Sequence, residues 1–153
     1  CALPILLSTL HSNTAITTVD RLINLGVDRV WVGSALTAVL SQRLVRKVCF
    51  HCKESYQPDK EELAMLGLPE NGAYIHGKGC DVCMQSGYIG RVCISELLVI
   101  DEDVQEAIFA QKSPLEIKRI ALANGFQPFV EDAKEKVVEG LTTVSEILRK
   151  VPL

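Results

Sequence analysis

Two pairs of cysteines with the same spacing constrain this chain more than any other feature. Cys49-x2-Cys52 and Cys80-x2-Cys83 are separated by 27 residues in a chain of 153. Two such knuckles joined by a loop are typical of a structural zinc site, because each tight turn brings two sulfurs within about 2.3 Å of one ion. Four thiolates complete the tetrahedral coordination sphere, so no position stays open for water or substrate. The pattern therefore predicts a structural Zn²⁺ site and not a catalytic one.

Other uses of these cysteines remain open at this point. Two disulfides are disfavoured, because nothing in the sequence suggests export and cytosolic thiols stay reduced. A redox dithiol would need only one of the two knuckles. His51 lies inside the first knuckle and His76 shortly before the second, so either could replace a thiolate, although four cysteines already complete the site. Cys93 is expected to be a small buried apolar residue.

Composition excludes several classes of function. The chain is 48% hydrophobic and 23% charged, which is typical of a globular protein. A formal net charge of −3 gives no electrostatic footprint for nucleic acid, and acidic residues outnumber lysines between the knuckles. No apolar run approaches the roughly 18–20 residues of a membrane span. We therefore expect no nucleic-acid partner. The apolar start at Cys1 leads us to expect a fragment of a longer protein.

Local signals predict most of the regular structure. Val32, Leu36, Val39 and Leu40 keep helical spacing after a capping Asp28, which would place Arg43, Arg46 and Lys47 in the last turns of a helix. There Arg43 and Arg46 would pair with carboxylates or cap the helix end, and a role at a subunit interface stays open. The remaining expected elements are a buried strand over 5–10, a helix over about 14–25 capped by Ser12 or Asn13 and closed by Gly26, a short helix over 60–66, and a strand over 91–100.

Two capping boxes are expected near the C-terminus. Ser113 and Glu116 enclose Pro114 at a first helical position, and Gly125 would close that helix. Thr143 and Glu146 repeat the same spacing after Gly140. The last third of the chain should therefore be helical.

Four strings in order resemble the C-terminal third of the GspE/PilB-type ATPases of type II secretion and type IV pilus assembly. They are LLSTLHSNTA (6–15), LSQRLVRKVCFHC (40–52), GCDVCMQSGYIGRVCISELL (79–98) and EKVVEGLTTVSEIL (135–148). The resemblance implies an α/β fold, namely the C-terminal part of a RecA-like P-loop NTPase domain. Residues 1–48 would belong to the ATPase core, 49–90 to a tetracysteine zinc-binding subdomain, and 91–153 to a strand and a small helical C-terminal subdomain.

The resemblance also implies roles for single residues. The STLH string matches the family's histidine box, so His11 would sense the γ-phosphate of ATP. The string GYxGR matches at Gly87, Tyr88, Gly90 and Arg91, so Arg91 would contact the nucleotide, a task that suits a planar guanidinium. Cys49, Cys52, Cys80 and Cys83 match the family's zinc ligands one for one. These cysteines favour the assembly and secretion branches over the retraction branch.

The resemblance further implies a motor that works as a homo-hexamer with ATP and Mg²⁺. Such a motor is cytoplasmic, is held at the inner membrane through partners, and acts on an inner-membrane platform protein to assemble pili or secrete proteins. This chain, however, contains no G-x-x-x-x-G-K-[ST] phosphate-binding loop. We therefore expect the chain alone to be inactive as an ATPase. The alternative is a free-standing zinc-binding protein-interaction module.

Overall fold

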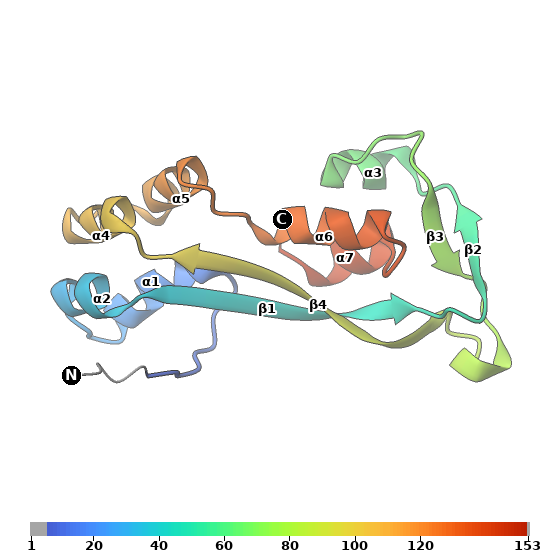
Figure 1. Cartoon of the computed structure of the whole chain (residues 1–153), viewed down its shortest axis with the longest axis horizontal. Helices are drawn as coiled ribbons and strands as arrows, with labels where there is room; N and C mark the ends of the chain where they lie inside the picture. The colour runs from blue at the N-terminus through green and yellow to red at the C-terminus, as the bar shows by residue number, and fades with distance from the viewer. Residues whose placement is uncertain (1–5, 153) are drawn as a thin grey trace. The chain divides into compact units, whose positions relative to one another are not determined.

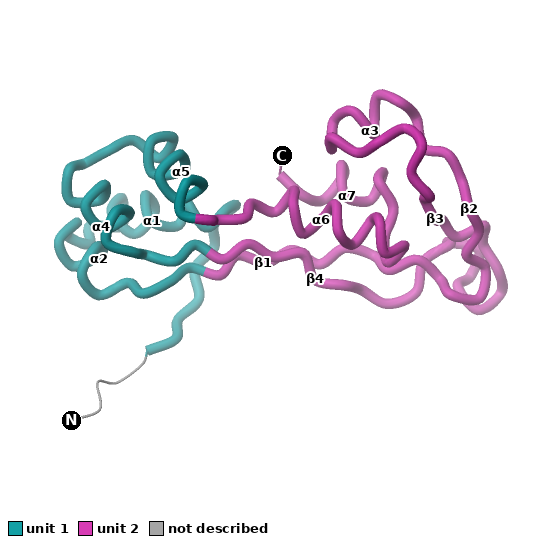
Figure 2. The backbone as a smooth tube through the Cα atoms, turned by 45° about the horizontal axis from the view of Figure 1, so that its top comes forward, with its two compact units in different colours: residues 1–39, 98–124 teal, residues 40–97, 125–153 magenta. Residues whose placement is uncertain are grey.

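The computed structural model describes residues 6–152, and the chain divides into two compact units (Figures 1 and 2). Unit 1 comprises residues 1–39 and 98–124, and unit 2 comprises residues 40–97 and 125–153. Each unit is assembled from two separate stretches of sequence. The stability of each therefore depends on contacts between residues far apart in the chain.

Unit 1 is helical over most of its described residues. Its helices are α1 (Ala15–Asn24), α2 (Arg29–Ala35), α4 (Glu102–Phe109) and α5 (Pro114–Ala123). Helix α1 packs against α2 and α5, and α4 packs against the same two helices. Helices α2 and α4 approach closely at Gly33, whose carbonyl accepts a 2.6 Å hydrogen bond from Gln105 Nε2. A Cβ atom at Gly33 would lie 2.5 Å from the Phe109 ring, so any larger residue would require that ring to shift.

Helix caps expected from the sequence are present in unit 1. The Asp28 side chain accepts a 2.8 Å hydrogen bond from the Val30 N–H at the start of α2. Ser113 and Glu116 form the predicted reciprocal capping box of α5, with Pro114 at its first position. Both predictions are confirmed because a cap involves only neighbours in sequence.

The described residues of unit 2 form two strand pairs, three α-helices and a short 3₁₀ helix. Its elements are β1 (Ala38–Val48), β2 (Lys53–Tyr56), α3 (Lys60–Leu66), β3 (Tyr74–Gly77), a short 3₁₀ helix (Asp81–Cys83), β4 (Tyr88–Val99), α6 (Phe129–Val138) and α7 (Val144–Lys150); the first residues of β1 and the last of β4 belong to unit 1. β1 pairs with β4, and β2 pairs antiparallel with β3. The expected helix over 60–66 and strand over 91–100 are confirmed by α3 and β4.

The core of unit 2 lies between these strands and helices. Helix α7 contacts α3, and α6 contacts β3. The largest fully buried side chains include Tyr74 and Phe129, and the Tyr74 hydroxyl donates a 2.6 Å hydrogen bond to the Pro69 carbonyl. The buried cluster consists of Val45, Leu63, Leu66, Leu68, Tyr74, Ile94, Phe129, Ala133, Val137, Val144, Ile147 and Val151.

Three sequence-based expectations about local structure are wrong. Residues 6–10 form no strand, and Leu6 and Leu7 are 88% and 91% exposed, because no other segment of the described chain pairs with them; position 5 lies outside the described residues. Helix α1 is capped by Thr14 in a box with Thr17, not by Ser12 or Asn13. The second helix ends at Ala35 instead of continuing to Lys47.

The segment after Ala35 is strand β1, which carries Arg43, Arg46 and Lys47. Its burial alternates, with Val39 and Val45 buried and Leu40 and Leu44 exposed. Backbone hydrogen bonds tie its two ends to β4, from the Cys49 N–H to the Gly87 carbonyl (2.9 Å) and from the Ile100 N–H to the Thr37 carbonyl (3.0 Å). Pairing with a distant strand thus overrides the helical spacing of the apolar residues.

Candidate metal centre

The two cysteine knuckles lie where the strand pairs of unit 2 meet. Cys49 and Cys52 join β1 to β2, while Cys80 and Cys83 join β3 to β4 around the 3₁₀ helix. Because β1 pairs with β4 and β2 with β3, the two connections come together. The 27 residues between the knuckles form β2, α3 and β3, so the long spacer is a folded excursion whose ends are adjacent.

Two glycines permit the close approach of the connections. A Cβ atom at Gly77 would lie 2.0 Å from the Gly87 carbonyl oxygen, and one at Gly87 would lie 2.3 Å from the Gly77 oxygen. Gly87 also has φ of +74°, a conformation that L side chains rarely adopt. A backbone hydrogen bond also joins the two connections, from the Lys78 N–H to the Cys52 carbonyl at 3.0 Å.

The four sulfurs form one compact group. All four lie within 4.8 Å of one another, at 3.9 Å between Cys49 and Cys80, 3.8 Å between Cys52 and Cys83, and 3.7 Å between Cys80 and Cys83. Four sulfurs placed tetrahedrally about 2.3 Å from one ion lie about 3.8 Å apart. A disulfide needs about 2.05 Å, and all four thiols are free. The group therefore has the dimensions of a tetrahedral metal site.

Backbone N–H groups point at the sulfurs. Gly79 donates to Cys52 Sγ at 3.3 Å, and Cys80 and Gly87 donate to Cys83 Sγ at 3.2 and 3.3 Å. Burial acts to raise the pKa of Cys83, but these donors and the adjacent sulfurs outweigh it and lower that pKa to about 6. Burial and the neighbouring thiols raise the pKa of Cys52 to about 12. Full ionisation of the group thus needs a compensating cation.

The nearby histidines and the remaining cysteine lie outside this group. His51 is exposed and its ring stacks on Phe50, with ring centroids 3.9 Å apart. His76 Nε2 is 3.1 Å from Glu54 Oε1 across the β2–β3 pair. The candidate metal group in the described chain consists of the four cysteines without either histidine. Cys93 is only half-buried on β4.

His11 and Arg91, the residues that the family resemblance implies contact ATP, are both exposed. His11 is exposed in the irregular segment that precedes α1, in unit 1. Arg91 is exposed on β4, in unit 2. Both side chains are accessible to a ligand or to another part of a larger assembly.

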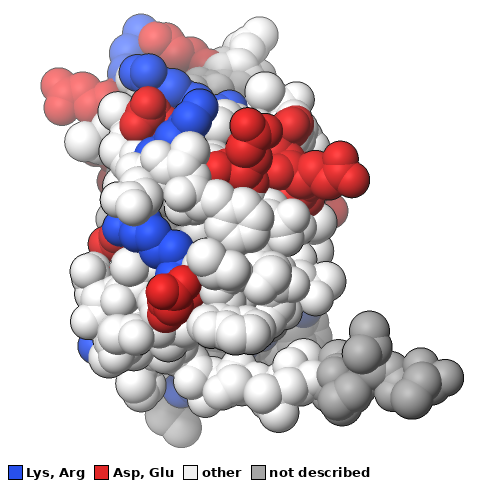
Figure 3. Space-filling view, turned by 90° about the vertical axis from the view of Figure 1, so that its left-hand side faces the viewer, with Lys and Arg blue, Asp and Glu red and all other residues white. Residues whose placement is uncertain are grey.

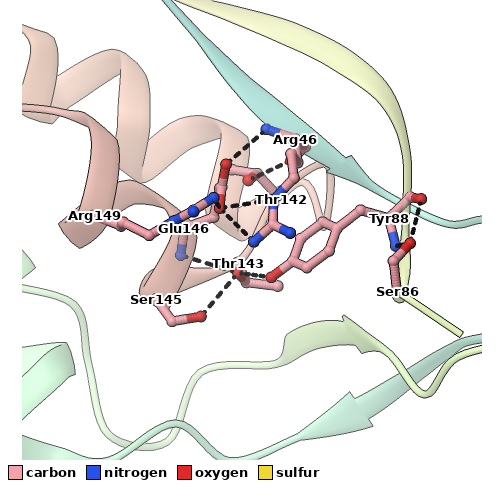
Figure 4. A network of polar contacts seen from close by, with 8 residues as sticks. All are labelled: Arg46, Ser86, Tyr88, Thr142, Thr143, Ser145, Glu146 and Arg149. Carbon is pink, nitrogen blue, oxygen red and sulfur yellow. Dashed lines mark hydrogen bonds and ion pairs between the residues drawn. The ribbon is translucent and has the colours of Figure 1, made fainter.

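Sequence reasoning missed a polar cluster that includes residues close in sequence to both knuckles, which we call the Glu146 cluster: Arg46, Tyr88, Thr143, Glu146 and Arg149 (Figure 4). The Glu146 side chain is 1% exposed and binds Arg46 Nη2 at 2.8 Å and Nε at 3.0 Å, and also pairs with Arg149. The Arg46 guanidinium lies 4.0 Å above the centre of the Tyr88 ring. Tyr88 Oη is 2.8 Å from Thr143 Oγ1.

Glu146 thus has a different role from the one its spacing suggests. Thr143 caps α7 as expected, but the Glu146 carboxylate turns to Arg46, 100 residues away in sequence. Burial acts to raise the pKa of Glu146, but hydrogen bonds from Arg46 and Arg149 outweigh it and lower that pKa to about 2. The sequence suggested that Arg46 pairs with a carboxylate, and this is confirmed. Nothing in the sequence identifies which carboxylate.

Charge is mixed on the surface. On the described part of the face in Figure 3, Lys and Arg side chains are interspersed with Asp and Glu and form no continuous basic area. This face therefore lacks the continuous basic area on which nucleic-acid-binding proteins rely.

Among residues 6–152, no helix combines the length and the apolar character that crossing a bilayer requires.

Comparison with known proteins identifies relatives of this chain. It is 45% identical over 150 residues to the type IV pilus assembly ATPase PilB of Thermus thermophilus. This match covers 95% of the chain and 17% of the relative. It is 42% identical over 148 residues to type II secretion system protein E of Pseudomonas aeruginosa and 36% identical to type II secretion system ATPase E of Vibrio cholerae, each match covering 95% of the chain and 29% of the relative.

The chain thus spans less than a third of the length of these relatives. The family model for type II/IV secretion system proteins matches residues 5–149, which include both knuckles and most of both units. This chain therefore belongs to the type II/IV secretion system protein family.

Proposed function

We propose that this chain is the C-terminal part of a motor ATPase that powers type IV pilus assembly or type II protein secretion. The observation that carries the proposal is the match over 95% of the chain to relatives named as ATPases of these two systems. The proposed motor is a cytoplasmic homo-hexamer that hydrolyses ATP with Mg²⁺ and acts on an inner-membrane platform protein. The proposed fold of the parent domain is RecA-like, divided in this chain at 1–48, 49–90 and 91–153.

Within that motor we propose that the four cysteines hold a structural zinc ion. The tetrahedral spacing of the sulfurs, the free thiols and the N–H donors to Cys52 and Cys83 support this role. Bound zinc would supply a cross-link between the β1–β2 and β3–β4 connections and no reactive position. Cys49 and Cys83 would hold it from the buried side, and Cys52 and Cys80 from the half-exposed side.

We propose that His11 senses the γ-phosphate and that Arg91 contacts the nucleotide. Their exposure and their match to the STLH and GYxGR strings support these roles. The chain lacks the phosphate-binding loop, so the proposal assigns ATP binding and hydrolysis to the complete motor and predicts that the chain alone is inactive.

A chimaera tests the motor proposal. Residues 5–149 of this chain would replace the matching segment of the Thermus relative, and ATP hydrolysis by the purified protein would be measured. We expect the chimaera to retain activity, His11→Ala to abolish it, and Arg91→Ala to weaken nucleotide binding. The control Arg119→Ala, at another exposed arginine, should leave activity unchanged. A folded, zinc-loaded chimaera without ATPase activity would overturn the proposal.

Metal content tests the zinc assignment separately. We expect about one zinc per purified chain by inductively coupled plasma mass spectrometry, with the thiols titratable after chelation under denaturing conditions. Oxidised cysteines without metal would refute the zinc site. The motor proposal would then still be tested by the ATPase activity of the chimaera.

A further inference from the structure

The Glu146 cluster lies next to both metal knuckles along the chain. Arg46 precedes Cys49 by three residues on β1, and Tyr88 follows Cys83 by five residues at the start of β4. Between Cys83 and Tyr88 stands Gly87, whose N–H donates to Cys83 Sγ and whose carbonyl accepts from the Cys49 N–H. The residue next to Tyr88 is therefore hydrogen-bonded to one sulfur, that of Cys83, and to the backbone of a second ligand residue, Cys49.

Further hydrogen bonds tie β1 to α7 and to the loop between α6 and α7. The Val48 N–H donates to the Leu141 carbonyl at 2.8 Å, and Thr142 Oγ1 donates to the Arg46 carbonyl at 2.9 Å. The Arg46 N–H also donates to Glu146 Oε1 at 3.1 Å. Both the backbone and the side chain of Arg46 are thus held by the C-terminal helix pair.

The burial of Glu146 makes this arrangement demanding. Its carboxylate is 1% exposed, and the cluster supplies the two guanidinium groups that neutralise it. A buried charge without such partners is strongly unfavourable, so Arg46 and Arg149 must stay in place for α7 to pack. Because Arg46 lies on β1 only three residues before Cys49, the position of Arg46 restricts the position of Cys49.

We infer that the Glu146 cluster is a positioning element for the metal centre: it holds β1 and β4 at the spacing that four-thiolate coordination requires. This inference rests on the proposed zinc site. By thermodynamic reciprocity, a cluster that favours metal binding is itself stabilised by the metal to the same extent. Zinc bound at the four cysteines therefore stabilises the packing of α7, although none of these cysteines lies on that helix.

Zinc affinity of the full chain measures this coupling. The probe is Zn²⁺ in competition with a chromophoric chelator, under reducing conditions, for the wild-type chain and for Glu146→Gln. Groups hydrogen-bonded to metal ligands typically contribute 10- to 100-fold in affinity, and we expect Glu146→Gln to weaken zinc binding by the lower end of this range, about 10-fold, because Glu146 reaches the cysteines only through the backbone of β1. Tyr88→Phe keeps the ring beneath Arg46 but removes the hydroxyl bonded to Thr143, so we expect a loss of about 2- to 10-fold.

Glu96→Gln is the matched control. Glu96 is also a buried carboxylate of unit 2, at 5% exposure, but it accepts a hydrogen bond from the Phe129 N–H at the start of α6. The control should retain wild-type zinc affinity even where it lowers stability. The increase in melting temperature on adding zinc should likewise be smaller in Glu146→Gln than in Glu96→Gln.

Each outcome is decisive. Weaker zinc binding in Glu146→Gln, with wild-type affinity in Glu96→Gln, supports the inference. Equal affinities in all variants, or equal losses in both, overturn it, the latter because general destabilisation then explains the effect. If Glu146→Gln does not fold, the same comparison is made with Tyr88→Phe. A wild-type chain that holds no zinc overturns the zinc proposal together with this inference.

Discussion

Alanine at Gly87 tests whether the two connections that carry the cysteines cross as closely as described. The added Cβ would lie 2.3 Å from the Gly77 carbonyl oxygen, a backbone atom that cannot rotate away. Gly90, three residues later on β4, provides a matched control. Its φ is +72°, against +74° at Gly87, and a Cβ there would meet nothing within 4 Å.

The expected costs follow from these two differences. A left-handed conformation costs an L residue about 1–2 kcal/mol, and this cost is common to Gly87→Ala and Gly90→Ala. Steric overlap in a packed region adds about 1–3 kcal/mol at Gly87 alone. We therefore expect Gly87→Ala to destabilise unit 2 by about 2–5 kcal/mol and Gly90→Ala by about 1–2 kcal/mol.

Urea unfolding of the reduced, zinc-loaded chain measures both values. The three tyrosines, Tyr56, Tyr74 and Tyr88, all belong to unit 2, so their near-ultraviolet circular dichroism reports on that unit. The single tryptophan, Trp31, belongs to unit 1 and provides an internal control. The Trp31 transition should change less than the tyrosine transition. Equal destabilisation by the two substitutions would refute the close approach of Gly77 and Gly87.

Three further predictions concern charge, metal and caps. The pKa of Glu146 is lowered from 4.5 to about 2, so its stabilisation, about 2–3 kcal/mol after allowance for solvent around Arg46, is present above pH 4.5 and lost as pH falls toward 2. The difference between the urea midpoints of wild type and Glu146→Gln should thus stay constant above pH 4.5 and become smaller as the pH falls from 4.5 to 3. Serine at Cys49 or Cys80 should abolish zinc retention and change the circular dichroism of unit 2, and unchanged spectra and melting would contradict a structural metal site. Ser113→Ala should cost unit 1 about 1 kcal/mol by Trp31 fluorescence, and a loss below 0.3 kcal/mol, roughly the resolution of the measurement, would show that the cap contributes nothing.

The four cysteines that come together in one group could be predicted from sequence because two short spacings define them. Each x2 turn is a local feature, so the four sulfurs needed only to be brought together by the strands. The strand pairing that does this could not be predicted in detail, since the 27-residue spacer gave no sign that β2 and β3 pair with each other. The mutual need for glycine at Gly77 and Gly87 likewise became visible only when the two backbones were placed side by side.

Sequence by itself determined the features whose partners are a few residues apart. These include the cap at Asp28, the capping box at Ser113, helix α3, and the cysteine knuckles. Tertiary structure decided the rest. The segment 38–48 has helical spacing but becomes a strand because it pairs with β4. Since β4 lies far along the chain, the local sequence gives no sign of this pairing. Glu146 has the spacing of a capping box, yet its buried charge is neutralised by Arg149 of its own helix and by Arg46 of β1, and the contact with Arg46 exists only after β1 and α7 have packed together.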